Sequence, residues 1–263
     1  MRLGLLLIEP PGKPASGWII GIWVVMLTLI VGLFCSGVIC GVAGTTLGGW
    51  ESVWFYRDAF WKGWLLTIIL SIFSLAGSLL IGLVAALARR SIILPLRSLA
   101  LLYVEVIRGT PLLVQILVFY YVVANGMGLE NRLVAGVIIL SLFSGAYLAE
   151  MIRAGIEAIP SSQIESARSI GLTAFQSYRF VIAPQALRHI LPPLAGQFAS
   201  LIKDSSLLSI IGIGEFTLAA QQVNSATFRT LESYLPLAIG YLALTFPVSL
   251  LSKLLEKSMR YEA

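Results

Sequence analysis

Long runs without a charged residue constrain this chain more than any other feature. Four such runs of at least twenty residues recur along its 263 residues, with short connectors between most of them. A helix needs about 20 residues to cross about 30 Å of hydrocarbon. Hydrophobic residues make up 58% of the sequence and charged residues 12%, against about 45–50% apolar residues in a soluble domain. The sequence therefore predicts an all-α integral membrane protein.

About six transmembrane helices are expected, four of them from uninterrupted apolar runs. These runs are Gly17–Trp50, with its helix at Trp18–Cys40, then Gly63–Ala88, Gly109–Leu129 and Ser233–Ser252. The first run is long and lacks a small-residue cleavage site, so we interpret it as a retained span rather than a signal peptide.

Two further spans contain charged residues. Leu133–Ala149 continues through Glu150 and Arg153 toward Ile159, and Ile190–Ile202 continues past Lys203 and Asp204 to Ile211. A charge inside a membrane helix costs about 3 kcal/mol or more unless it meets a partner, a cavity or the interface. The charges in these two spans are therefore candidate functional residues.

The distribution of Lys and Arg predicts the orientation, because these residues concentrate in cytoplasmic loops. Six spans place both termini on one side, and thirteen Lys and Arg fall on that side: Arg2, Lys13, Arg89, Arg90, Arg97, Arg108, Arg153, Arg168, Arg179, Arg188, Lys253, Lys257 and Arg260. The other side carries Arg57, Lys62, Arg132 and Arg229. We expect both termini in the cytoplasm. The same placement at span ends, beside lipid, favours a membrane topology over nucleic-acid binding for this basic chain.

This orientation makes residues 159–188 a cytoplasmic loop between the fourth and fifth spans. Within it, Pro160 and Ser161 are typical of a helix start and Gly171 of a helix stop, which predicts a helix of two to three turns. The helix has only a partial apolar face. It either lies at the membrane surface or docks into a partner protein.

The spacing of residues in this loop matches a known motif. Glu165, Ser166 and Ala167 are followed after three residues by Gly171, and after nine more by Val181-Ile182-Ala183-Pro184. This pattern resembles the Glu-Ala-Ala signature of bacterial ATP-binding-cassette (ABC) importer permeases, with small substitutions at three positions. In that family the loop forms a coupling helix that docks into the ATPase. The resemblance therefore assigns ATPase coupling to Glu165, Ser166, Ala167, Gly171 and Pro184.

Three other segments resemble the polar amino-acid branch of these permeases, which includes histidine, glutamine and arginine importers. They are Glu105–Gln115, Gly145–Arg153 and Leu191–Leu207. The resemblance covers residues 61–263, which we expect to form a five-helix permease domain. Residues 1–60 would then add a cytoplasmic segment, an extra transmembrane helix and an external loop.

The resemblance implies a permease subunit in the bacterial inner membrane that imports polar amino acids. It implies two ATPase subunits that bind ATP and Mg²⁺, a second permease subunit, identical or homologous, and an extracytoplasmic amino-acid-binding protein. The chain has no Gly-rich phosphate loop, and its one histidine, His189, has no neighbouring metal ligands in the sequence. We therefore expect no enzyme activity, metal or cofactor in this chain.

Four charged residues are candidates for an ion-pair cluster that acts as a gate. Glu150 and Arg153 lie three apart and share a helix face, where they can pair with each other or with Glu105 and Arg108 of the neighbouring span. A structural cluster near the cytoplasmic end is favoured over a contact with substrate.

Four polar residues are candidates for the substrate path. An amino-acid zwitterion needs a donor and an acceptor away from bulk water, and Gln115, Gln197, Lys203 and Asp204 carry such groups. Lys203 and Asp204 are expected in a helix that Pro192 and Pro193 break. Pairing of these polar groups between helices, or with a second subunit, is an equally good reading.

The competing function is a stand-alone, ion-coupled secondary transporter. In such a protein the membrane charges would serve ion coupling, and the loop would be an interfacial helix.

Overall fold

The computed structural model describes residues 47–259, and every regular element in that range is helical. The chain divides into two compact units, Met1–Trp54 and Phe55–Ala263. Of the first unit the structure describes only α3 (Leu47–Trp54). The predicted span at Trp18–Cys40 lies outside the described residues.

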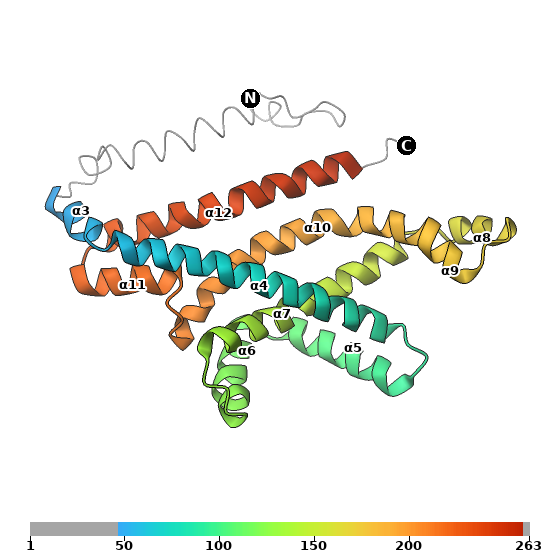
Figure 1. The fold of residues 1–263 in the computed structure, drawn as a ribbon, viewed down its shortest axis with the longest axis horizontal. Helices are drawn as coiled ribbons and strands as arrows, with labels where there is room; N and C mark the ends of the chain where they lie inside the picture. Colours follow the sequence, from blue (N-terminus) through green and yellow to red (C-terminus); the bar gives the residue numbers. More distant parts are fainter. Residues whose placement is uncertain (1–46, 260–263) are drawn as a thin grey trace, which may run out of the picture. The chain divides into compact units, whose positions relative to one another are not determined.

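The second unit is a bundle of long and short helices (Figure 1). Its elements are α4 (Arg57–Arg89), α5 (Leu94–Gly109), α6 (Leu112–Val118), the π-helix η1 (Phe119–Ala124), α7 (Arg132–Glu157), α8 (Ser161–Ser169), α9 (Ala174–Ser177), the π-helix η2 (Tyr178–Ile182), α10 (Ala183–Asp204), the 3₁₀-helix η3 (Ser205–Ile211), α11 (Phe216–Thr227) and α12 (Thr230–Met259).

Three of these helices, α4, α7 and α12, are each long and apolar enough to cross a membrane. The number rises to five if α5 with α6–η1, and α9–η3 with α11, are each one bent span. Large apolar side chains such as Phe73 and Leu80 of α4 are more than 60% exposed, as expected of a surface that faces lipid. The predicted spans Gly63–Ala88, Leu133–Ile159 and Ser233–Ser252 correspond to α4, α7 and α12.

Helices α4 and α7 pack more extensively against each other than any other pair of described helices. Small residues allow this approach: a Cβ on Gly82 would lie 2.6 Å from Leu148 Cβ and 3.0 Å from the Gly145 carbonyl oxygen. Without a hydrophobic driving force between helices in lipid, such close packing is what holds membrane helices together. The fully buried hydroxyls of Thr67 and Ser71 donate to carbonyls of their own helix, so they add no unpaired polar group.

Between the predicted spans Gly63–Ala88 and Gly109–Leu129 the sequence indicated only a connecting loop on the cytoplasmic side. That interpretation is wrong, because Leu94–Gly109 forms α5. The charges Arg97, Glu105 and Arg108 hid this helix from a search for charge-free runs. The helix that follows is correspondingly shorter than the predicted Gly109–Leu129 span, since α6 and η1 end at Ala124. The axes of α5 and of the α6–η1 segment are bent by 113° at Thr110 and Pro111.

The loop predicted at residues 159–188 is also shorter than expected. Helix α8 occupies its first part as predicted, but a continuous series of helices runs from Ala174 through α10 to Ile211. Pro192 and Pro193 lie inside α10, so the predicted break there is wrong. Helix α12 packs along α10, and Ser252 Oγ of α12 donates to the Pro192 carbonyl at 2.8 Å. The sequence reading also missed α11, which is twelve residues long and rich in polar residues.

Gly82→Ala tests the close approach of α4 to α7. We expect the added methyl to force the two helices apart and to lower the free energy of unfolding by about 1–3 kcal/mol. Thermal unfolding of the purified protein in detergent measures the loss. Gly126→Ala is the matched control, because a Cβ there meets nothing within 4 Å. Equal stability of the two variants would contradict this account of the packing.

Candidate functional site

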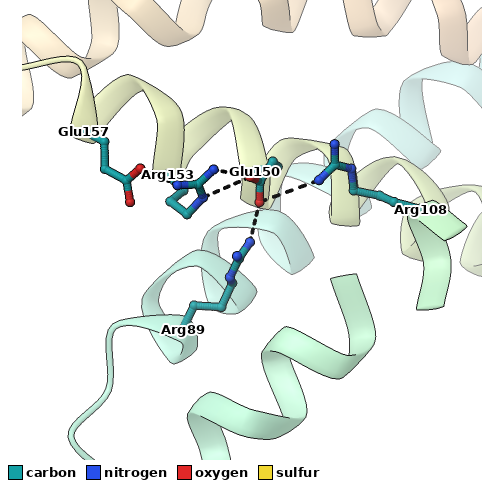
Figure 2. Close-up of polar contacts among 5 residues, drawn as sticks. All are labelled: Arg89, Arg108, Glu150, Arg153 and Glu157. Carbon is teal, nitrogen blue, oxygen red and sulfur yellow. Dashed lines mark hydrogen bonds and ion pairs between the residues drawn. The ribbon is translucent and has the colours of Figure 1, made fainter. Parts of the chain in front are cut away.

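An ion-pair cluster ties the ends of three helices together around Glu150 (Figure 2). Glu150 Oε2 contacts Arg89 Nη1 at the end of α4 and lies 3.8 Å from Arg108 Nη1 at the end of α5. Its other oxygen, Oε1, accepts from Arg153 Nε at 2.9 Å and from Arg153 Nη2, one turn along α7. Arg153 also pairs with Glu157.

The centre of this cluster is largely shielded from solvent. The Arg89 side chain is 11% exposed and that of Glu150 is 21% exposed, whereas Arg108 and Arg153 are more open. A carboxylate removed from water in this way needs charged donors, and three guanidinium groups supply them. The cluster therefore fixes how α4, α5 and α7 meet.

Of the four residues that the sequence predicted for this cluster, three belong to it: Arg108, Glu150 and Arg153. Glu105 is exposed on α5 and forms no ion pair with the rest of residues 47–259. Arg89 and Glu157 were missed. Arg89 was counted only among the Lys and Arg residues of the cytoplasmic side. The signal that would have found it is its position at the last residue of a helix that packs on α7.

Helix α8 has the bounds that the sequence predicted, and its C-terminus explains the glycine. Gly171 has φ +84°, its N–H donates to the Arg168 carbonyl, and the Leu172 N–H donates to the Ala167 carbonyl. This pair of bonds is the Schellman motif, which places glycine in the left-handed conformation and ends a helix sharply. Pro184 lies at the start of α10, directly after the π-helix η2.

The surface around α8 carries exposed groups of two kinds. Glu165 and Ser166 are exposed, while Ala167 is buried. Three large apolar side chains nearby are also exposed: Ile170 by 77%, Phe175 by 70% and Phe180 by 63%. Figure 1 shows α8 and α9 together at one end of α10. A rigid, polar helix flanked by exposed apolar residues is a suitable surface for docking a protein.

The four candidates for the substrate path do not form one group. Gln115 is buried, and its Nε2 donates to the Ile107 carbonyl and to both oxygens of Thr110, so this side chain braces the bend between α5 and α6. Gln197 Nε2 donates to Ser144 Oγ of α7 at 3.3 Å. At the end of α10, Lys203 is exposed and Asp204 is half-buried.

A buried carboxylate that the sequence reading missed lies at the start of α11. Glu215 is fully buried, and it accepts from the backbone N–H groups of Thr217 at 2.8 Å and Leu218 at 2.9 Å. The Tyr241 hydroxyl of α12 donates to Glu215 Oε2 at 2.8 Å and lies 3.0 Å from Thr217 Oγ1. Glu215 thus caps α11 and binds it to α12.

The same point is also joined to α4. The Phe216 N–H donates to Thr67 Oγ1 at 3.2 Å, and a Cβ on Gly63 would lie 2.9 Å from Ala219 Cβ. We call Glu215, Phe216, Thr67, Gly63 and Tyr241 the three-helix junction. The sequence contained one signal for it, an acidic residue directly before an apolar-polar helical segment.

The comparisons with known proteins agree with this architecture. The family model of the binding-protein-dependent transport system inner membrane component matches residues 78–261, well over half of the chain. The chain belongs to this family. Its members are permease components of ABC transporters, which are transport subunits and not enzymes.

Two curated relatives match most of the chain. The probable glutamine ABC transporter permease protein GlnM of Bacillus subtilis is 38% identical over 77% of this chain and 94% of its own length. The glutamine transport system permease protein GlnP of Escherichia coli (strain K12) is 35% identical over 80% of this chain and 97% of its own length.

Two solved structures have the same fold. One, described as the crystal structure of an amino acid ABC transporter with histidines, superposes with a TM-score of 0.74 at 39% identity and covers 80% of this chain and 98% of its own. An inward-facing MetNI methionine ABC transporter superposes with a TM-score of 0.61 over 80% of this chain and 98% of its own. At 18% identity the second structure supports the fold alone.

Arg89→Gln tests the cluster around Glu150. Removing one guanidinium leaves a shielded carboxylate with fewer charged donors, and we expect a loss of about 1–3 kcal/mol, between the values for exposed and buried ion pairs. Thermal unfolding in detergent is the measurement. The adjacent Arg90 is exposed, so Arg90→Gln makes the same chemical change outside the cluster. A cluster without structural importance would give the two variants the same stability.

Glu215→Gln and Tyr241→Phe together test the three-helix junction. Each variant should lower the free energy of unfolding. The double variant should lose about 1 kcal/mol less than the sum of the two single losses, because both changes act on the same hydrogen bond, from the Tyr241 hydroxyl to Glu215 Oε2. Thermal unfolding of the four proteins closes the cycle. Tyr234→Phe serves as the control, since Tyr234 is 37% exposed on the same helix. Additive losses would show that the two side chains are not coupled.

Proposed function

We propose that this permease component imports polar amino acids across the bacterial inner membrane. Both curated relatives are named for glutamine transport, and the 39% identical structure is an amino acid ABC transporter. In this proposal the chain works with a second permease subunit, identical or homologous, two ATPases in the cytoplasm and an extracytoplasmic amino-acid-binding protein. ATP and Mg²⁺ bind to the ATPases and not to this chain.

Helix α8 is the proposed contact with the ATPase. Glu165 and Ser166 are exposed there, Ala167 holds α8 against its own domain, and Gly171 ends the helix sharply. Helix α8 lies between α7 and the α9–α10 segment in the chain. A force on α8 therefore reaches α7 on one side and α10 on the other. Helix α7 carries Glu150, so ATPase closure would act directly on the ion-pair cluster, which in this proposal is the inner gate.

The proposed topology has six spans with both termini in the cytoplasm. Arg89, Arg108 and Arg153 gather at the α8 end of the bundle, which supports a cytoplasmic location of that end. The sixth span is the one predicted at Trp18–Cys40, and lipid surrounds the bundle.

The proposed substrate path follows α10. Gln197 and Asp204 lie seven residues apart and so share one face of the helix, and Lys203 is exposed beside them. An ammonium group of the substrate would meet Asp204, and its carboxylate would meet Lys203. Gln115 is not part of the proposed path, because it is buried and its amide donates to three acceptors within the α5–α6 bend. Gln197 is only half-buried, and its amide donates to one side chain, that of Ser144.

The observation that carries the proposal is the exposed α8 in a chain of this family. Its test is ATP-dependent uptake of labelled glutamine, histidine and arginine into proteoliposomes that hold this chain, its ATPase and its binding protein. Glu165→Lys reverses the charge on the docking face, and we expect uptake to fall about tenfold or more, which corresponds to about 1.4 kcal/mol of docking free energy.

Glu130→Lys is the matched control, since it makes the same charge change at an exposed position before α7, at the far end from α8. The assembly of each variant with the ATPase is measured by size-exclusion chromatography. Uptake by the chain without its ATPase, driven by an ion gradient, would instead support a secondary transporter. Unchanged uptake by Glu165→Lys would overturn the role of α8.

A further inference from the structure

The turn between α11 and α12 is built on an aromatic residue in a strained conformation. Only Phe228 and Arg229 separate the two helices. Phe228 has φ 55° and ψ 28°, and its N–H donates to the Asn224 carbonyl at 2.7 Å. This left-handed conformation closes the end of α11, a role that glycine usually fills because it has no Cβ to clash with its own backbone.

Every other left-handed residue in the part of the chain described here is a glycine: Gly128, Gly171 and Gly212. Phe228 gains no burial in exchange for its strain, because its side chain is 87% exposed. Strain at a residue that does not contribute to the core is a mark of a functional position.

The surroundings of Phe228 are polar rather than apolar. Gln221, Gln222 and Ser225 are exposed on α11, and Arg229 is exposed at the turn. Lipid would leave such groups without hydrogen-bond partners, so this surface faces water or another protein rather than lipid. Within residues 47–259 the Arg229 side chain forms no ion pair. An exposed aromatic beside an unpaired arginine, inside a polar rim, has the composition of a protein-binding hot spot.

The turn lies at the far end of the bundle from α8. Helix α12 has 30 residues, which is a length of about 45 Å. The last residue of α12, Met259, lines a pocket together with Arg188. Arg188 lies near the start of α10, which is the end of that helix where α8 lies. The turn at its first residue is therefore on the opposite face of the membrane from the proposed ATPase contact.

We infer that Phe228 and Arg229 are a docking tip for the soluble binding protein, on which transport in this family depends. Phe228 enters an apolar pocket of that protein, and Arg229 meets carboxylates at the rim of the pocket. This inference rests on the proposed function. The three-helix junction holds α11 at its other end, so the tip is presented in a fixed geometry and little ordering is needed on binding.

The test is uptake by the reconstituted importer as a function of the concentration of its purified binding protein. Phe228→Gly relieves the left-handed strain, so we expect its thermal unfolding temperature to equal or exceed that of the native chain. We expect the binding-protein concentration at half-maximal uptake to rise about tenfold or more, with the maximal uptake unchanged. Arg229→Gln should raise it less and should weaken its dependence on salt.

Met127→Gly is the control, because Met127 is 80% exposed in a different turn, before α7. An unchanged half-maximal concentration for Phe228→Gly would overturn the inference. A lower maximal uptake alone would also overturn it, because it would indicate a role at the membrane or in the fold. A smaller fraction of permease dimer would overturn it as well, because it would indicate contact between permease subunits.

Failure of the inference is distinguishable from failure of the proposed function. If the native chain shows no uptake that depends on the binding protein, the proposed function is wrong. If native uptake depends on the binding protein and Phe228→Gly behaves like the native chain, only the docking tip is wrong.

Discussion

The contact between α4 and α7 is the interaction on which the rest of the domain depends. Glycine at position 82 lets the two helix backbones approach closely, and in lipid such packing takes the place of the hydrophobic effect as a force between helices. Near the start of α4, Thr67 joins the three-helix junction. At its end, Arg89 reaches Glu150 of α7. One helix thus connects the two polar centres of the structure.

These two polar centres hold opposite ends of the bundle by different means. The cluster around Glu150 uses charged groups from three helix ends and keeps part of its surface open to solvent. The three-helix junction is centred on the fully buried Glu215 and uses one carboxylate, one phenol and backbone N–H groups. The open cluster is the easier of the two to rearrange, because solvent can replace a lost partner there. This difference fits a proposed gate beside α8 and a fixed frame at the far end.

Local chemistry explains why some elements were predicted accurately and others were not. The bounds of α8 followed from Pro160, Ser161 and Gly171, since capping depends on residues adjacent in sequence. Helix α5 was missed because Arg97, Glu105 and Arg108 interrupt its apolar residues. The predicted break at Pro192 and Pro193 was wrong, because α10 continues through both prolines. Helix α12, distant in sequence, packs along α10 there, and its Ser252 Oγ donates to the Pro192 carbonyl.

The sequence by itself determined the membrane class, the three long spans, the pairing of Glu150 with Arg153 and the spacing of the α8 motif. Each of these depends on composition or on residues within a few positions of one another. Only the tertiary structure decided that Arg89 completes the ion-pair cluster, that Gln115 braces a bend, and that Glu215 is buried against Tyr241. Those contacts join helices far apart in the chain, and their geometry is set by how closely the helix backbones can approach.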